Sequence, residues 1–221
     1  MYSRHIVADI VAHKSDALAA FQRYCALMQA YPRLLFCDHG GEYESASFNA
    51  FCREHNIDRG FSTPYEAYQN GIAESGVRLV SEKARALALQ SGLPYDYWSF
   101  FIRWAVFLIN HLPSSSSGKL PVLEQGLPEA AHRIRAFGCL CFVYRGKQMV
   151  ENSKLSPRGV RAVFLGVDHD RGTHCWLALN LHDGSILRSN HMTFHEDVFP
   201  LRAVAIPQSL VQNSTDIGFI N

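Results

Sequence analysis

The hydrophobic pattern of the chain changes character at residues 113–118, PSSSSG, and this change constrains the fold more than any other feature. Before it, apolar residues at helical spacing alternate with short apolar runs, which is typical of an α/β layered domain. After it, short apolar runs are separated by turns containing Gly and Asp, which is typical of a small β-barrel or sandwich. The sequence therefore predicts two domains of different class.

We expect an α/β core over residues 1–112, a linker over 113–130, a small β-rich basic domain over 131–200 and a tail over 201–221. Strands of the core are expected at 6–11, 34–37 and 57–62, and its helices at 15–28, 45–55, from about 72 to 91, and 96–111. In the second domain, strands are expected at 139–144, 159–167, 174–179 and 185–194.

Charge is distributed unevenly along the chain. Residues 1–112 carry 10 Lys and Arg against 11 Asp and Glu, whereas seven basic residues between 133 and 161 face a single acid, Glu151. A basic cluster on a strand-rich segment is what binding to phosphates requires, and a solvated basic face is the alternative. The candidate nucleic-acid contacts in this cluster are Arg133, Arg135, Arg145, Lys147, Lys154, Arg158 and Arg161.

Six cysteines lie mostly inside apolar runs, without the regular spacing of a disulfide framework. This placement favours reduced thiols and an intracellular protein. The longest apolar stretch, residues 97–110, is interrupted by Ser99 and Arg103 and is too short to cross a bilayer, so no membrane partner is expected.

An apolar run ends abruptly on Asp38 and is followed by His39 and two glycines. A carboxylate at a strand end is held rigidly, and glycines beside it let a ligand approach the backbone; a plain strand-to-turn transition is the alternative. Glu74 lies 36 positions further on, at the expected start of the long helix. Carboxylates at a strand end and a neighbouring helix start can together bind Mg²⁺, and a second ion nearby would assist phosphodiester chemistry.

The segments CDHGGEY (37–43) and TPYEAYQNGIAES (63–75) resemble the integrase core of copia-type retrotransposon polyproteins, in which 35 residues separate the last two members of an acidic triad, as they separate Asp38 from Glu74. The resemblance continues through SGLPYDYWSFFIRWAVFLINHLPSS (91–115), RAFGCLCFVY (135–144) and KLSPRGVRAVFLGV (154–167). It covers nearly the whole chain up to about Pro200, with several motifs in the right order.

The resemblance implies an RNase H-like core that inserts DNA ends into target DNA by phosphoryl transfer with Mg²⁺ or Mn²⁺. Asp38 and Glu74 would be the second and third triad carboxylates, with catalytic and metal-binding roles. Expected partners are the element ends and target DNA, with a second copy of the chain as a candidate, and the expected location is the nucleus. The further residues expected at DNA are Gln69, Asn70, Gly71, Arg78 and Arg85.

The departures from that family weaken the expected chemistry. The first triad aspartate lies on a strand upstream of the segment that corresponds to residues 1–4, so we expect the core to be truncated, with its first strand missing. Asp9 lies at a position typical of a solvent-facing or edge residue and is not expected to replace the first triad aspartate. Because two carboxylates offset the mutual repulsion of two dications less well than three, we expect weak or absent metal binding and little strand transfer.

Three functions therefore stay open: an integrase fragment with impaired strand transfer, a catalytically inactive nucleic-acid-binding remnant, and a nuclease of the same fold acting on RNA–DNA hybrids. The sequence ESGVR (74–78) stands where the family has Glu-Arg-x-Asn-Arg, which favours the remnant. The spacing of Asp38 and Glu74 favours an integrase origin. Whether the chain is an enzyme is left open.

Overall fold

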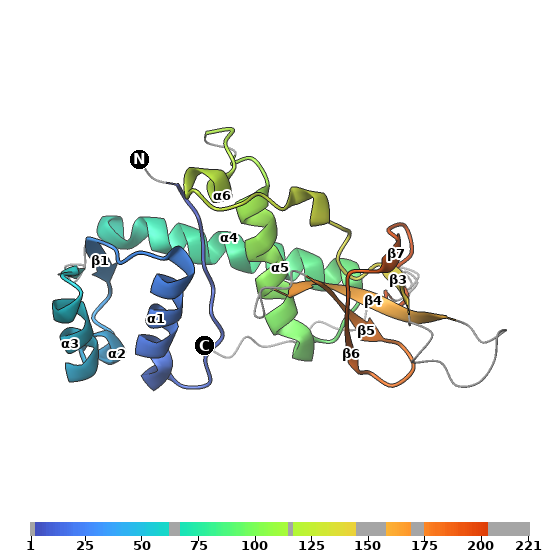
Figure 1. Ribbon diagram of the computed structural model, residues 1–221, viewed down its shortest axis with the longest axis horizontal. Helices are drawn as coiled ribbons and strands as arrows, with labels where there is room; N and C mark the ends of the chain where they lie inside the picture. The colour runs from blue at the N-terminus through green and yellow to red at the C-terminus, as the bar shows by residue number, and fades with distance from the viewer. Residues whose placement is uncertain (1–2, 62–66, 115–116, 145–157, 169–174, 203–221) are drawn as a thin grey trace, which may run out of the picture. The chain divides into compact units, whose positions relative to one another are not determined.

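The computed structural model describes residues 3–61, 67–114, 117–144, 158–168 and 175–202, and the side chains of 67–70 are not described (Figure 1). The chain forms two compact units. Unit 1 comprises Met1–Lys83 and Ala105–Ala131, and unit 2 comprises Ala84–Trp104 and His132–Asn221. The division passes through two helices, α4 (Ala67–Ser91) and α5 (Trp98–His111), so each helix contributes to both units. The domain boundaries expected at residues 112 and 131 stay predictions.

Unit 1 is built on a β-α-β element. Strands β1 (Leu34–Cys37) and β2 (Asp58–Phe61) pair in parallel, and the crossover between them contains α2 (Gly41–Glu44) and α3 (Ala46–Glu54). The Ser45 hydroxyl caps α3 by accepting a hydrogen bond from the Phe48 N–H. The other elements of this unit are η1 (Lys14–Asp16), α1 (Ala17–Met28), the first part of α4 (Ala67–Ser91), the second part of α5 (Trp98–His111) and α6 (Pro121–Glu124).

One face of β1 belongs to the core of unit 1 and the other is open. Leu35 packs against a buried cluster of Phe48, Cys52 and Ile57, and the Phe21 ring stacks on Phe48 with centroids 5.4 Å apart. On the opposite face, Leu34 and Phe36 are each 54% exposed. Among the described residues, β2 is the only strand that pairs with β1.

The strand expected at residues 6–11 is not formed. The buried Asn110 side chain of α5 instead holds the Ile6 backbone, donating to its carbonyl at 2.7 Å and accepting from its N–H at 2.9 Å. Asp9 accepts from the Ile10 N–H and pairs with Arg23 at 2.7 Å. Hydrogen bonds from side chains to the backbone compete with strand pairing in this segment, so it lies extended without a ladder.

Unit 2 contains a five-stranded antiparallel sheet in the order β6-β5-β4-β3-β7. Its strands are β3 (Leu140–Tyr144), β4 (Gly159–Asp168), β5 (Cys175–Asn180), β6 (Ile186–Ser189) and β7 (Met192–His195). Short 3-10 turns, η2 (Tyr95–Tyr97) and η3 (Ala131–Arg133), lie before α5 and β3 in the chain. The single strand expected over 185–194 is wrong, because the chain turns at Ser189, whose hydroxyl accepts from the His191 N–H at 2.9 Å.

Aromatic side chains build the core of unit 2. Trp104 meets Phe164 edge to face with centroids 5.1 Å apart, and Phe101 meets Phe137 in the same way at 5.7 Å. A bulge between Phe164 and Gly166 breaks the register of β4, and Gly166 adopts a positive φ of 117° beside the Trp104 ring. The first part of α5 therefore supplies ring contacts to this sheet.

The predicted fold class, an α/β core followed by a small all-β domain, is confirmed by the parallel β-α-β element of unit 1 and the antiparallel sheet of unit 2. Within the described ranges, none of the helices combines the length and the apolar character needed to cross a membrane.

Candidate metal and nucleic-acid site

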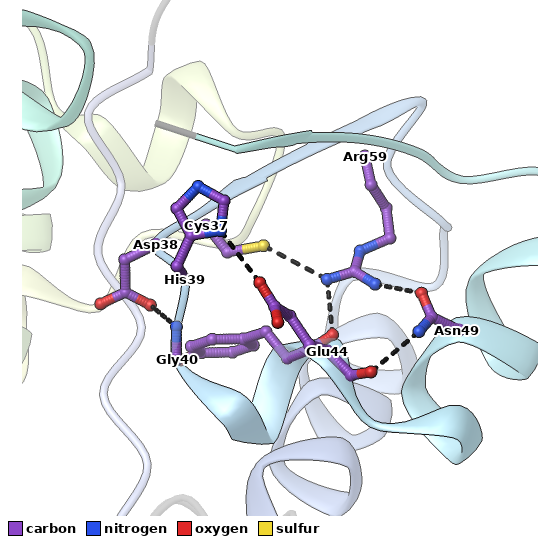
Figure 2. Close-up of polar contacts among 8 residues, drawn as sticks. Cys37, Asp38, His39, Gly40, Glu44, Asn49 and Arg59 are labelled. Carbon is purple, nitrogen blue, oxygen red and sulfur yellow. Dashed lines mark hydrogen bonds and ion pairs between the residues drawn. The ribbon is translucent and has the colours of Figure 1, made fainter. Parts of the chain in front are cut away.

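Asp38 follows β1 directly and is exposed, as the sequence predicts. One of its carboxylate oxygens accepts a hydrogen bond from the Gly40 N–H at 3.2 Å, which turns the chain away from the strand (Figure 2). A side chain at position 40 would lie about 3 Å from the carboxylates of both Asp38 and Glu42. Gly40 thus leaves room for two carboxylates, whereas a side chain at Gly41 would meet nothing within 4 Å.

Arg59 on β2 ties together the elements that surround Asp38 (Figure 2). Its guanidinium donates to the Tyr43 carbonyl at 2.5 Å, to the Asn49 side-chain oxygen, and to the Cys37 sulfur at 3.6 Å. The same group lies 4.5 Å from the centroid of the Phe61 ring. One side chain therefore links β1, β2, α2 and α3.

The residue after Asp38 is also held in place. The His39 ring stacks on Phe61 with centroids 5.2 Å apart, and its Nδ1 lies 2.9 Å from a Glu44 carboxylate oxygen. The Glu44 carbonyl accepts from the Asn49 amide at 3.0 Å, so the pair is connected to the Arg59 network (Figure 2). A carboxylate on Nδ1 fixes the orientation of an imidazole.

The surroundings of Asp38 are negatively charged. Burial is the main cause that raises the pKa of the neighbouring Tyr43, and the negative charges of Asp38 and Glu42 raise it further. An excess of carboxylate charge at a surface favours cations. The local field is thus compatible with the expected metal-binding role of Asp38.

Glu74, the second expected ligand, lies on α4 and is exposed. The expected start of this helix near residue 72 is wrong, because α4 begins at Ala67, so Glu74 lies beyond the first turn. Helix propagation adds one hydrogen bond per residue, which lets weak helix formers such as Asn70 and Gly71 continue a helix. The predicted sharing of one ion by Asp38 and Glu74 stays a prediction, and the described residues contain no group of three or more metal-binding side chains.

The residues expected at DNA near Glu74 occupy α4 rather than a loop. Gln69 and Asn70 lie in its first turns, where their side chains are not described, and a side chain at Gly71 would meet nothing within 4 Å. Arg78 and Arg85 are exposed. Their contacts with DNA stay predictions.

Two arginines of the basic cluster in the second domain contact other residues of unit 2, and two others are exposed. The guanidinium of Arg133 lies 5.6 Å from the Trp176 ring centroid, and that of Arg135 lies 5.3 Å from the Phe194 centroid. Arg135 also donates to the Ile134 carbonyl at 2.6 Å and lies 3.8 Å from a Glu196 carboxylate oxygen. These two arginines therefore contribute to the structure of unit 2.

The other members of the cluster differ in what the structure shows. Arg158 and Arg161 are exposed at the start of β4, where they are open to a ligand. Arg145, Lys147 and Lys154 lie outside the described residues.

Sequence reasoning did not single out Arg59 and Asn49. The available signal was a charged residue inside a short strand between two apolar positions, Ile57 and Phe61. A charge at such a position is retained only when partners satisfy it, and those partners come from α2 and α3.

Residues 139–206 match the family described as the retroviral polymerase SH3-like domain. The chain is also similar to the retrovirus-related Pol polyprotein from transposon TNT 1-94 of Nicotiana tabacum, with 27% identity over 99% of this chain and 16% of that protein. The polyprotein from transposon RE1 of Arabidopsis thaliana is 27% identical over 80% of this chain and 12% of that protein. The chain thus spans a small part of the length of these relatives.

Two solved structures are similar to this chain at low identity. The HTLV-2 integrase catalytic core domain in complex with magnesium is 20% identical, with a TM-score of 0.41 over 50% of this chain and 68% of that chain. A chain of the simian T-cell lymphotropic virus intasome in complex with PP2A regulatory subunit B56 gamma is 17% identical, with a TM-score of 0.46 over 81% of this chain and 63% of that chain.

Proposed function

The chain is related to part of the Pol polyproteins of retrovirus-like transposons, and from this premise we propose that it is an integrase fragment that binds DNA and retains two carboxylates of a metal site, Asp38 and Glu74. The observation that carries the proposal is the similarity over 99% of the chain, which includes both exposed carboxylates and the SH3-like segment. The proposal includes Mg²⁺ or Mn²⁺ as the ion and the nucleus as the location.

The two carboxylates of the proposed site suit one metal ion better than two. Asp38 and Glu74 offer the carboxylate oxygens that Mg²⁺ prefers, and water would complete its coordination. A bound ion would stabilise charge on a phosphoryl oxygen. Since the described residues provide no third ligand, we expect one weak site and little DNA strand transfer by this chain alone.

The chain's own groups prepare the site in two ways. The Gly40 N–H fixes the carboxylate of Asp38, which lowers the entropy lost when a ligand binds. The exposed Arg78 adds positive charge on the part of α4 that carries Glu74. Positive charge of this kind attracts DNA through its phosphates.

The metal site can be tested on the full chain by titrating Mn²⁺ and following the free ion by electron paramagnetic resonance. Asp38→Asn and Glu74→Gln are each expected to weaken Mn²⁺ binding about tenfold, because each removes one charged ligand. Asp96→Asn, at an exposed acid in η2, is the matched control and should leave binding unchanged. Equal binding by all three variants would remove the metal site from the proposal.

The chemistry is tested with labelled duplex ends and a target duplex in Mg²⁺, Mn²⁺ or EDTA. We expect joined products at or near background. Efficient metal-dependent joining that Asp38→Asn abolishes would contradict the expected impairment while supporting an integrase.

A second candidate, a nucleic-acid-binding protein without chemistry, is favoured by Arg158 and Arg161, which are exposed and have no ion pair among the described residues. It predicts DNA binding that persists in EDTA and falls with salt, the logarithm of the affinity changing by roughly 0.9 per phosphate contact per logarithmic unit of salt. Affinity that does not respond to salt would exclude this candidate.

A further inference from the structure

One face of the β3–β4–β7 part of the sheet displays aromatic rings next to positive charge. Alternation along β3 turns Cys141 and Val143 into the core, where they are buried, so Phe142 and Tyr144 lie on the other face. Phe142 pairs with Arg161 of β4 and with Thr193 of β7, and these neighbours share its face. We call Phe142, Tyr144, Arg161 and His195 the β3–β4 aromatic face.

This face is closed at one end and open at the other. Val163 on the same face is fully buried, whereas two residues earlier Arg161 is exposed and Tyr144 is 48% exposed. Tyr144 pairs with Gly159, which has no side chain to cover the ring. The aromatic surface is therefore accessible at the start of β4.

The face is also ordered. The His195 ring meets Phe142 at 79° with centroids 5.5 Å apart, and the Phe142 ring lies beside Gly159, where an added Cβ would be 3.5 Å away. The His195 ring and the Gly159 backbone thus restrict the Phe142 ring from two directions. A ring already held in place loses little entropy when a flat ligand stacks on it.

The charge of the face is positive. The residues of β4 and β7 that pair with Leu140, Phe142 and Tyr144 on this face include Arg161 and His195 but no Asp or Glu. Among the described residues, no ion pair engages Arg161, and Arg158 is exposed just before the strand. A polyanion fits this surface better than an acidic or neutral protein segment does.

We propose that the β3–β4 aromatic face stacks the bases of unpaired nucleotides in DNA, while Arg161 contacts the adjoining phosphate. Bases within a duplex are already stacked on one another, so exposed rings gain most from unpaired bases. This inference rests on the proposed function, since it takes DNA as the partner, and it specifies which form of DNA the second unit binds.

The test uses the full chain in EDTA, with fluorescence anisotropy of a labelled single-stranded oligonucleotide and of a duplex of the same sequence. Tyr144→Ala is expected to weaken single-strand binding about tenfold, within the range for loss of one stacked base, and to change duplex binding less than twofold. Phe142→Leu, which removes the ring but keeps the apolar volume, should act in the same direction.

Two control variants and one charge variant separate stacking from other causes. Tyr144→Phe keeps the ring and should bind like the wild type, and Tyr95→Ala removes a 75% exposed ring elsewhere in the same unit and should have no effect. Arg161→Gln should reduce the dependence of single-strand affinity on salt. Because Tyr144 and Tyr95 are exposed, thermal unfolding should match the wild type for both variants.

The outcomes distinguish this inference from the proposed function. Single-strand binding that is equally insensitive to Tyr144→Ala and Tyr95→Ala would overturn the stacking inference and leave DNA binding intact. Equal loss of single-strand and duplex affinity in Tyr144→Ala would also overturn it. If the wild type binds neither oligonucleotide, both the inference and the proposed function fail.

Discussion

Gly40 and Gly41 follow Asp38 and His39, and the space around the two glycines differs. Gly40 has an extended backbone with φ −61°, so its lack of a side chain serves the space that the carboxylates of Asp38 and Glu42 occupy. Gly41 opens α2 into free space. The two glycines look equivalent in the sequence, but only at Gly40 do neighbouring carboxylates leave no room for a side chain.

Among single residues, Arg59 supports the Asp38 turn most directly. We expect Arg59→Lys to destabilise the chain by about 2 kcal/mol, because lysine cannot serve the Tyr43 carbonyl and the Asn49 side chain together and leaves part-buried acceptors unpaired. Urea unfolding followed by circular dichroism measures the change. Arg53→Lys, at an exposed position in α3, is the control and should stay within about 0.5 kcal/mol. Equal midpoints for the two variants would show that Arg59 does not hold these elements together.

At the scale of helices and strands, the periodicity of apolar residues and the residues that cap helices predicted most of the elements. The apolar run at 34–37 is β1 with the same bounds, and the Ser45 cap starts α3. Local patterns succeed there because the side chains that drive each element, such as Phe48, lie within it.

The misses came from interactions that the local pattern does not contain. The turn between β6 and β7 depends on Ser189 bonding to the His191 backbone, and the two strands then form the opposite edges of the sheet, beside β5 and β3. Segment 6–11 has the composition of a strand, but its backbone is held by Asn110, more than a hundred residues away in the chain. Long-range partners of this kind cannot be identified from one sequence.

Replacing either of two glycines, one inside α4 and one just after it, by alanine should change the stability of the fold in opposite directions. At Gly76, inside the helix, an added Cβ would meet the Ile6 side chain at an ordinary 3.7 Å, so Gly76→Ala should stabilise by about 0.5–1 kcal/mol. Gly92 has φ +69° and lies against the Leu201 backbone, so Gly92→Ala should destabilise by about 2 kcal/mol or more. Thermal unfolding of both variants measures the difference. A loss of stability in Gly76→Ala would mean that Ile6 cannot accommodate the methyl group.

At the scale of the whole molecule, the domain classes were accessible from the sequence, but the sharing of α4 and α5 between the units was not. Trp104 and Phe101 look like ordinary residues of a buried helix, and only their rings against Phe164 and Phe137 reveal which sheet they support. For the candidate site, the position of Asp38 at the end of β1 was predicted, whereas Glu74 lies beyond the first turn of α4 and not at its start. The Arg59 network was not predicted, since its partners are carbonyl and amide groups supplied by the fold.

The cysteines offer separate reporters for the two units. Cys25, Cys37 and Cys52 lie in unit 1, and Cys139, Cys141 and Cys175 lie in unit 2; all six are buried thiols outside any disulfide. Burial raises the pKa of Cys139 and of Cys141 to about 12. Because the thiolate is the reactive form, these two thiols should resist alkylation while unit 2 is folded.

Alkylation at increasing urea, read by mass spectrometry of peptides, should therefore label the two sets at different concentrations. We expect the unit 1 cysteines to react first, because in the described part of the chain the sheet of unit 1 has two strands and that of unit 2 has five. Fully denatured chain serves as the control for complete labelling. Simultaneous labelling of both sets would show that the units unfold as one.

The open side of β1 has a practical consequence for anyone who handles this protein. Among the described residues, β1 pairs with a strand on one edge only, and it exposes Leu34 and Phe36, so it can recruit extended segments from other molecules. Concentrated samples would then aggregate by intermolecular strand pairing at β1, while the rest of each molecule kept its fold. Phe36→Lys places a charge on this strand and is expected to reduce such aggregation.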